Sequence, residues 1–497
     1  QTPDKLNTPP SAKPSFIMLA SPPHSIVGRC VACVTLATLA LYWQSTAVSS
    51  QPNLVVIIAD DLGYGETGMM GNAEIPTPAI DALARSGVRC TSGYVTSSYC
   101  SPSRAGFLSG RYQSRFGYDL NPTGERNNHP NAGLPAEQKT FVKHLQSAGY
   151  HTSLIGKWHL GTRPPQVPTS KGFDRFFGFL HEGHYYVPGP PFENVWTMLR
   201  DISLPAGQFQ TDQRTIRGNY APINEPAYDA GNPVMEGSEP IDDWKYLTDT
   251  ITDKAVRSIS RSASNPFALV VSYTAVHSPM QATLEDHQRM DHIEDSQRRI
   301  FAGMLIAMDR GVGRILKTLD QQNLREETLV VFFSDNGGPT AELTSSNAPL
   351  RGGKGSLYEG GVRIPMVWSM PGTIPVGADE DKPVLSIDIA PSFLSLALNQ
   401  ESQTDMDGIN VLPWIGRGTF TSERTVWWRM PRGARALRQG HWKFVQARQN
   451  QPVELFDLES DPGETQNLSE TQPARLKKLL SVWDSLQSEM PPAKTFD

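Results

Sequence analysis

The sequence predicts an α/β fold with a large, mixed but mainly parallel sheet flanked by helices, followed by a small C-terminal α+β domain. Two observations carry this prediction. Short aliphatic runs alternate with segments of helical periodicity up to about Trp414, which is typical of strands and helices arranged around a parallel sheet. Beyond that point several short strand-like segments follow one another and a final helical segment closes the chain, which indicates an antiparallel sheet plus one helix.

The expected elements of the large domain follow from residue patterns. Residues 53–59 form a continuous aliphatic run, as in a strand buried on both faces of a parallel sheet. Further strands are expected at residues 88–95, 150–156, 266–273, 328–333 and 365–369. Helices are expected at residues 77–87, 139–148, 246–260, 300–319 and 385–396. Between residues 181 and 243 periodicity fades, and we expect a long irregular loop.

The C-terminal segments complete the domain plan. Strands are expected at residues 425–430, 436–438, 441–447 and 453–458, and a helix at residues 473–490. We therefore expect a leader at residues 1–49, a large domain at residues 50–415 and a small domain at residues 416–497.

The composition limits the classes of function. The net charge of −6 gives no indication of a nucleic-acid partner. The four cysteines, which include the pair Cys30 and Cys33 in an apolar run, do not form a disulfide framework. That run, residues 26–43, follows basic residues and precedes the small residues 45–47, a pattern typical of a cleaved export signal. We expect an exported protein, periplasmic or secreted; an uncleaved N-terminal anchor is the alternative.

The stretch of residues 98–112 is the first candidate site. It reads as a loop entering a helix, with Ser101 as the N-cap, Pro102 in the first turn and Gly110 at the end. Cys100 would lie at the helix N-terminus with Arg104 one turn further on, which favours an anion there. On these residues alone Cys100 is either an ordinary buried cysteine or an activated thiolate nucleophile.

Acidic residues follow two of the expected strands. Asp60 and Asp61 come after the first strand, and Asp335 and Asn336 come after the strand at residues 328–333. Because ligands bind at the carboxyl ends of strands in such sheets, these side chains are candidates for one site. Their oxygen atoms favour calcium or magnesium over zinc.

A longer pattern links these residues to a known family. Cys100-x-Pro-Ser-Arg104, continued by Ala-Gly-Phe-Leu-Ser-Gly-Arg-Tyr, resembles the signature of the formylglycine-dependent (type I) sulfatases, which are arylsulfatase-like members of the alkaline phosphatase superfamily. Other blocks follow that family in order, at residues 53–65, 156–161, 334–338, 352–365 and 453–465. The resemblance implies an alkaline-phosphatase-like fold and hydrolysis of sulfate esters.

The resemblance also implies a cofactor and the site residues. Cys100 would be oxidised to formylglycine by a modifying enzyme, and calcium would be bound by the modified Cys100 with four oxygen donors, Asp60, Asp61, Asp335 and Asn336. Lys157, His277 and Lys354 would bind the sulfate, and the catalytic residues would be Cys100, Arg104, His159 and His277. In this scheme one hydroxyl of the hydrated formylglycine attacks sulfur, His277 protonates the leaving alcohol, and His159 deprotonates the second hydroxyl to release sulfate.

The substrate follows less directly from the residues. Export, together with the polar and aromatic segment at residues 181–186, favours a sulfated carbohydrate. Some family members place a sulfate-binding serine after the block at residues 172–174, but no serine is found here; His181 and His184 are candidates for its place, and Glu182 would have to face sugar hydroxyls. Two alternatives stay open: a phosphatase or phosphonate-ester hydrolase of the same superfamily, and an inactive relative that binds sulfated glycans.

Overall fold

The computed structural model describes residues 51–399 and 405–496. The expected leader, with Cys30 and Cys33, lies outside the described residues. None of the helices within the described ranges is both long enough and apolar enough to span a membrane.

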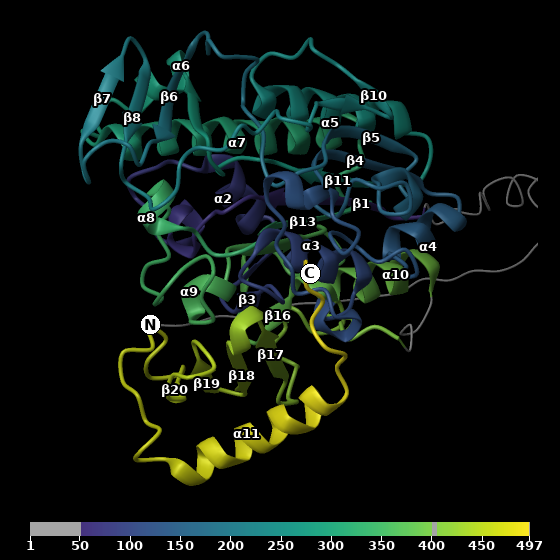
Figure 1. The fold of residues 1–497 in the computed structure, drawn as a ribbon. Helices are drawn as coiled ribbons and strands as arrows, with labels where there is room; N and C mark the ends of the chain where they lie inside the picture. The colour runs from purple at the N-terminus through teal and green to yellow at the C-terminus, as the bar shows by residue number, and fades with distance from the viewer. Residues whose placement is uncertain (1–50, 400–404, 497) are drawn as a thin grey trace, which may run out of the picture. The chain divides into compact units, whose positions relative to one another are not determined.

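A ten-stranded mixed sheet forms the centre of the molecule, as the α/β prediction requires (Figure 1). Its middle is parallel: β5 (Arg175–Phe179), β4 (His151–Lys157), β11 (Phe267–Ser272), β1 (Asn53–Ala59) and β13 (Thr328–Ser334) lie side by side in this order. One edge adds β9 (Met235–Glu236) and β10 (Glu239–Pro240), and the other adds β14 (Met366–Ser369), β2 (Val88–Cys90) and β15 (Ala378–Glu380). Antiparallel pairs in both edges make the sheet mixed.

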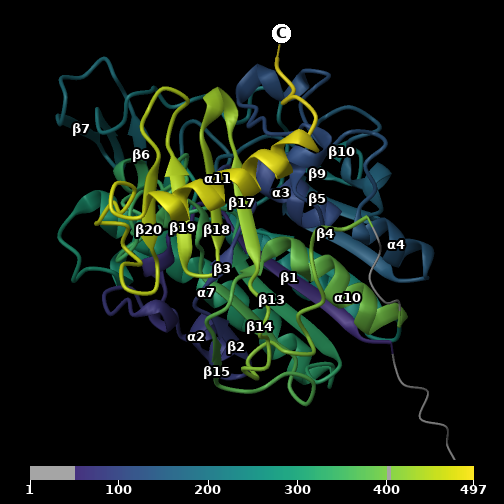
Figure 2. The same cartoon turned by 90° about the horizontal axis from the view of Figure 1, so that it is seen from below.

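Both faces of the central sheet are covered, because its strands carry apolar side chains on both faces. Along β1, Val55 and Ile57 belong to one buried core, and Leu54, Val56 and Ile58 belong to the other. The first core includes residues of α2 (Pro78–Arg85), α5 (Leu247–Ser262) and α7 (Ser296–Gln321). The second includes residues of α3 (Cys100–Ser109), α4 (Phe141–Ser147) and α10 (Ile389–Leu398) (Figures 1 and 2).

The prediction of an irregular loop at residues 181–243 is wrong. This segment contributes β6 (Val195–Arg200), β7 (Phe209–Asp212) and β8 (Thr215–Gly218), which pair with β12 (Met280–Thr283) in a separate four-stranded sheet. It also supplies β9 and β10 of the central sheet. The strands are short, and β7 is exposed along its whole length, so the segment carries little of the hydrophobic alternation that predicts strands.

The C-terminal part is an antiparallel sheet with one helix, as predicted. Strands β17 (Thr425–Arg429), β18 (Arg435–Gln439), β19 (Trp442–Gln446) and β20 (Glu454–Asp457) pair in sequence order. Helix α11 (Pro473–Ser488) lies across this sheet (Figure 2) and buries Leu479 and Trp483 in a third core. That core also contains Tyr94 and Tyr112, so the sheet packs against residues that flank α3.

Element boundaries differ from the predictions in places. The strand expected at residues 88–95 is divided into β2 and the short β3 (Gly93–Tyr94), which pairs with β16 (Val384–Leu385) in a sheet of their own. Helix α7 is longer than expected, because the Asp295 side chain caps it by accepting from Arg298 N. The described residues also include the short α-helices α6 (Leu284–Arg289), α8 (Thr340–Leu343) and α9 (Glu359–Val362).

Candidate active site

The predicted site residues meet at the carboxyl edge of the parallel strands. Asp60 and Asp61 follow β1, Asp335 and Asn336 follow β13, and Lys157 is the last residue of β4. Neighbouring parallel strands end at the same edge, so residues far apart in sequence become neighbours there. All five side chains are buried.

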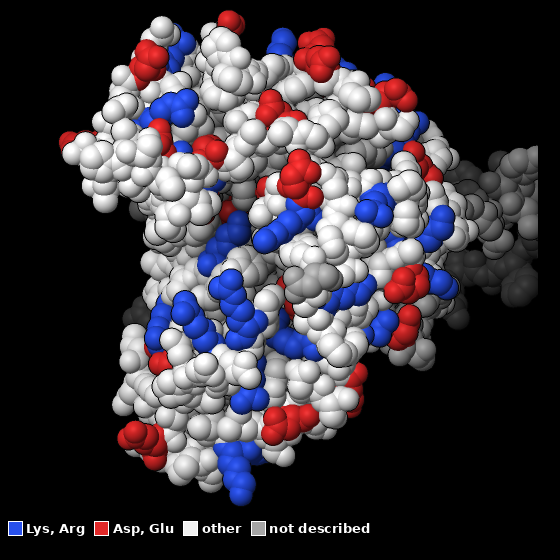
Figure 3. Space-filling model, viewed as in Figure 1, with Lys and Arg blue, Asp and Glu red and all other residues white. Residues whose placement is uncertain are grey.

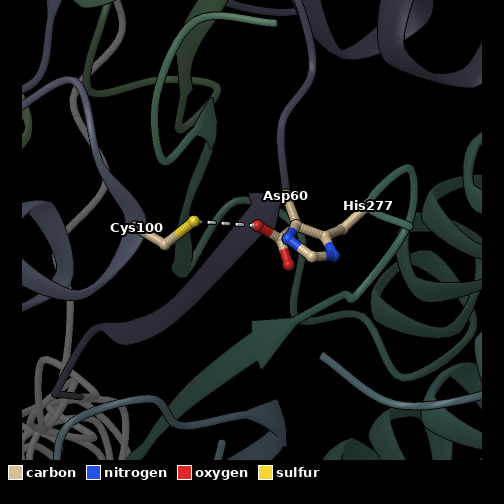
Figure 4. Close-up of side chains that lie close together, drawn as sticks. All are labelled: Asp60, Cys100 and His277. Carbon is tan, nitrogen blue, oxygen red and sulfur yellow. Dashed lines mark hydrogen bonds between the residues drawn. The ribbon is translucent and has the colours of Figure 1, made fainter. Parts of the chain in front are cut away.

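Four potential ligand groups converge at this edge. Atoms of Asp60, Asp61, Cys100 and Asp335 all lie within 4.8 Å of one another. The Cys100 Sγ lies 3.6 Å from Asp60 Oδ1 and 3.9 Å from Asp61 Oδ1. Figure 4 shows Asp60 between Cys100 and His277, with the sulfur directed at the carboxylate.

Cys100 reaches the cluster because it is the first residue of α3. The prediction that Ser101 caps this helix is wrong: the N-cap is Tyr99, without a side-chain cap. The Ser101 hydroxyl instead donates to the His159 carbonyl at 2.6 Å and lies 2.6 Å from the Tyr118 hydroxyl, because tertiary partners are available to it. Gly110 ends the helix as predicted, with φ 66° in the left-handed region.

Three basic side chains surround the three carboxylates. Lys157 Nζ donates to Asp60 Oδ2 at 2.7 Å, Lys354 Nζ donates to Asp61 Oδ2 at 2.7 Å, and Arg104 Nε donates to Asp335 Oδ2 at 2.8 Å. The formal charges of these side chains therefore balance. On the face seen in Figure 3, Lys and Arg side chains gather along a hollow of the surface.

Burial and charge shift the acidity of the cluster. Burial raises the pKa of Asp60 to about 7, with Asp335 adding to the effect and Lys157 opposing it. Burial would also raise the pKa of Asp61, but Lys354 and His277 outweigh it and hold the value at about 2. Burial and the Asp335 carboxylate raise the pKa of the Cys100 thiol, which disfavours the activated thiolate considered from the sequence.

The two histidines occupy different positions around the carboxylates. His277 Nδ1 lies 2.6 Å from the Ser278 carbonyl oxygen, and its Nε2 lies 3.7 Å from Asp61 Oδ2. His159 Nε2 lies 2.8 Å from the Pro122 carbonyl oxygen, which leaves the buried Nδ1 without a hydrogen-bond partner among the described residues. Burial lowers the pKa of both imidazoles, as do Lys354 at His277 and Lys157 at His159.

The donor set fits a hard divalent cation. Asn336 Nδ2 donates to Asp61 Oδ1 at 2.7 Å, whereas its Oδ1 is buried without a hydrogen-bond partner within the described ranges. A buried amide oxygen without a partner costs free energy unless a cation or donor meets it. Asp61 and His159, at the same edge of the sheet, have φ of 63° and 57°, in the left-handed region that costs free energy for non-glycine residues.

Several side chains of the segment at residues 181–186 are engaged within the protein. Glu182 accepts from Gly124 N at 2.7 Å and from Asn127 Nδ2 at 2.6 Å, so the protein itself satisfies its carboxylate. His184 is buried against the Phe179 ring. The fully buried Tyr186 is unavailable for stacking on a sugar and donates to the His277 carbonyl at 2.9 Å.

Sequence reasoning missed one residue that joins two predicted ones. Ser272 accepts from Arg104 Nη1 at 2.5 Å and donates to the Lys157 carbonyl at 2.7 Å. Its signal in the sequence is weak but real, because it is a polar residue at the carboxyl end of the otherwise apolar strand β11. The buried His181, a candidate for the missing serine, has an Nε2 without a hydrogen-bond partner in the described part of the chain.

Comparisons with known proteins identify the family of the chain. A family model described as sulfatase matches residues 52–399, and one described as N-sulphoglucosamine sulphohydrolase, C-terminal, matches residues 353–489. Arylsulfatase A of Homo sapiens is 31% identical, covering 85% of this chain and 84% of its own length. Steryl-sulfatase of Homo sapiens is also 31% identical, covering 71% of this chain and 68% of its own length.

Solved structures share the fold. The structure of Ps i-CgsB in complex with k-i-k-neocarrahexaose is 30% identical with a TM-score of 0.77, and the match covers 90% of this chain and 94% of that one. The phosphonate monoester hydrolase of Agrobacterium radiobacter, 18% identical with a TM-score of 0.58 over 88% of this chain and 95% of its own, shares the fold alone. The chain therefore belongs to the type I sulfatases of the alkaline phosphatase superfamily, and it is a sulfuric ester hydrolase.

Proposed function

We propose that this sulfatase hydrolyses the sulfate esters of sulfated carbohydrates, with a formylglycine made from Cys100 and with bound calcium. The observation that carries the proposal is the position of Cys100, whose sulfur lies against Asp60 and Asp61 inside a ring of basic side chains. A hydrated formylglycine in place of the thiol supplies two hydroxyls on one carbon, one for attack on sulfur and one for the release of sulfate.

Calcium is the proposed cation because the donors are oxygens. Asp60, Asp61, Asp335 and the unpartnered Oδ1 of Asn336 would hold it, together with the modified Cys100. When bound, a divalent cation supplies Lewis-acid stabilisation of negative charge on a transferring group. Because the charges of the surrounding side chains balance, a bound dication would leave the site net positive, as an anionic ester requires.

The basic residues would bind and orient the sulfate group. Lys157 is buried and Lys354 is partly buried, and both ammonium groups lie close to the carboxylates, so they are positioned before substrate arrives. Such preorganised charges stabilise developing charge better than water does. Arg104 would act on the same side, held by Ser272 and Asp335.

The histidines would move the protons. With Nδ1 donating to the Ser278 carbonyl, His277 would protonate the leaving alcohol from Nε2 in its imidazolium form, which the Asp61 carboxylate, 3.7 Å from Nε2, favours. With Nε2 engaged by the Pro122 carbonyl, His159 has the unpartnered Nδ1 free to act as the base that releases sulfate. In each imidazole a hydrogen bond to main chain fixes one nitrogen and so selects the other for chemistry.

The substrate class rests on relatives and on the expected export signal. The complex of Ps i-CgsB contains an oligosaccharide, and one matching family model is described as acting on N-sulphoglucosamine. A phosphonate-ester hydrolase is less favoured, since that likeness is confined to the fold. An inactive glycan-binding relative is also less favoured, because every motif residue is retained.

Peptide mass spectrometry around Cys100, together with assays on sulfated oligosaccharides and aryl sulfates, tests the proposal. The protein should be produced with a formylglycine-generating enzyme, and Cys100→Ala should be prepared in parallel as the control, because its methyl group cannot be converted to the aldehyde. We expect the aldehyde in the active protein and sulfate release from a sulfated sugar. A fully unmodified thiol in a preparation that turns over sulfate esters would refute the modification, and turnover of aryl sulfates alone would refute the carbohydrate assignment.

A further inference from the structure

Tyr228, from the segment for which the sequence predicted only loop, lies directly against His277. Its side chain is buried, and its ring meets the His277 ring edge-on, with centroids 6.3 Å apart and an interplanar angle of 84°. The Tyr228 hydroxyl lies 2.9 Å from Ser278 Oγ. Ser278 is also the residue whose carbonyl engages His277 Nδ1. The tyrosine therefore contacts both the imidazole and the residue that orients it.

The hydroxyls around Ser278 form a directed chain. Arg200 Nη2 donates to the Tyr228 hydroxyl at 2.8 Å, and Ser278 Oγ donates to Glu342 Oε1 at 3.0 Å. With those two directions fixed, Tyr228 donates its own proton to Ser278 Oγ. The Tyr228 hydroxyl then accepts one hydrogen bond and donates one, while Ser278 Oγ donates to Glu342 and accepts from Tyr228 and, at 3.4 Å, from Arg200 Nη2, so both hydroxyls are satisfied in one arrangement.

Arg200 anchors this chain in the fold. Its guanidinium is 2% exposed and pairs with Glu225, through Nη2 at 2.8 Å, and with Glu342. A buried arginine with two carboxylate partners is fixed in orientation, because its planar donors match them only in a narrow range of geometries. Arg200 is the last residue of β6, so the four-stranded sheet supplies the anchor.

The remaining sides of His277 are equally confined. A Cβ at Gly183 would lie 3.0 Å from a ring carbon of Tyr228 and 3.2 Å from His277 Nδ1, closer than ordinary van der Waals contact, so any larger residue there would press on both rings. From the other side the Tyr186 hydroxyl bonds the main chain of this loop, with the Thr274 carbonyl at 2.7 Å and the His277 carbonyl at 2.9 Å. The imidazole therefore has little freedom to turn.

We infer that Tyr228, held by Arg200, is a positioning residue for the His277 imidazole, and that the segment at residues 195–228 serves to hold the proton donor in place. This inference rests on the proposed role of His277. A proton donor must lie within hydrogen-bond reach of the leaving oxygen, and small displacements of a reacting group lower rates strongly.

A double-mutant cycle tests the inference. Tyr228→Phe removes only the hydroxyl, and it is compared in the wild-type and His277→Ala backgrounds on 4-nitrophenyl sulfate and on phenyl sulfate, whose alcohol is the poorer leaving group. Tyr273→Phe is the matched control, because that buried hydroxyl bonds Thr252 Oγ1 of α5 at 2.7 Å instead of the His277 loop.

We expect Tyr228→Phe to lower kcat on phenyl sulfate about tenfold with little change in KM, and to lower kcat on 4-nitrophenyl sulfate much less. In the His277→Ala background the same substitution should change kcat by less than about twofold. Tyr273→Phe should behave like the wild type. The inference would be overturned if Tyr228→Phe lowered kcat equally in the wild-type and His277→Ala backgrounds. It would also be overturned if a folded Tyr228→Phe protein kept full activity.

Two further measurements keep the result interpretable. If Tyr228→Phe does not fold, Ser278→Ala removes the next hydroxyl of the chain and should reproduce the same leaving-group dependence; a loss of equal size on both substrates would overturn the inference. Failure of the proposed function has a different signature, since His277→Ala alone would then slow both substrates equally.

Discussion

Glu464 and Glu359 share one buried lysine, and this arrangement predicts an unusual pH dependence of stability. Lys443 Nζ of β19 lies 2.8 Å from Glu359 Oε1 and 2.9 Å from Glu464 Oε1, and all three side chains are fully buried. Glu464 also accepts from Glu359 N at 2.6 Å, at the start of α9. The cluster therefore ties the C-terminal sheet to the segment that follows Lys354.

The two carboxyl groups respond oppositely to this environment. Burial raises the pKa of Glu464 from 4.5 to about 7, with the Glu359 carboxylate adding to the effect and Lys443 opposing it. At Glu359, burial is outweighed by Lys443, Arg363 and Arg438, which hold its pKa at about 2. At neutral pH Lys443 therefore has one fully ionised partner, Glu359, whereas Glu464 is protonated in a fraction of the molecules.

The sign and size of the effect follow from proton linkage. The folded state holds a proton on Glu464 that the unfolded chain loses above pH 4.5, so the contribution to stability is fully present below that pH and is lost as pH rises through 7. Each pKa unit corresponds to about 1.4 kcal/mol, and the pKa of about 7 makes slightly less than two units of the shift effective between pH 5 and pH 8, so the loss over this range is roughly 2–3 kcal/mol. For roughly 450 folded residues, the average unfolding entropy converts this to about 3 °C in Tm.

Glu464→Gln removes this titration while keeping the shape of the side chain. Thermal unfolding of the variant and of the wild type should be followed at pH 5 and at pH 8. The quantity to compare between the two pH values is the Tm of the variant minus the Tm of the wild type, because the effects of the other titrating groups cancel in this difference. We expect the variant to gain about 3 °C relative to the wild type between these pH values. Glu359→Gln is the matched control on the same lysine and should be destabilised at pH 8, because it removes the ionised partner. A Tm difference for Glu464→Gln that is independent of pH would refute the reasoning.

Three further predictions concern the site. His277→Ala should lower the rate of hydrolysis by up to about 10⁴-fold for sulfates with poor leaving groups, and much less for activated aryl sulfates. His159→Ala should lower the rate for both kinds of substrate alike and accumulate covalent sulfate at Cys100. Steady-state kinetics and intact-mass analysis measure these effects. Chelation should abolish activity and lower Tm, and added calcium should restore both; activity that survives complete removal of metal by elemental analysis contradicts the proposed site. Gly183→Ala should lower kcat with a near-normal Tm, because its Cβ would contact Tyr228 and His277. An unchanged kcat would mean that the segment around Gly183 shifts without displacing the His277 imidazole.

Much of the fold was readable from the sequence for local reasons. The strand at residues 53–59 was predicted with its observed bounds, because its apolar residues are continuous and the following Asp60 and Asp61 interrupt them. The C-terminal strands and helix were predicted because each is short, patterned and bounded by turn residues. Of the strands missed at residues 195–218, β7 is exposed along its whole length and leaves no hydrophobic pattern, whereas β6 is buried but pairs with β12, which lies far along the chain.

The sequence by itself determined the chemical identity of the site: which oxygens, which cysteine and which basic side chains follow which strand. Only the tertiary structure decided how they are held. Ser101 does not cap its helix but donates a hydrogen bond to the His159 carbonyl. Tyr228 is held beside His277 by hydrogen bonds with Arg200 and Ser278. Glu464 likewise met Glu359 across more than a hundred residues of chain. The physical reason is that strand and helix patterns are local, whereas hydrogen bonds and ion pairs between buried groups depend on which distant segments the sheet brings to its edge.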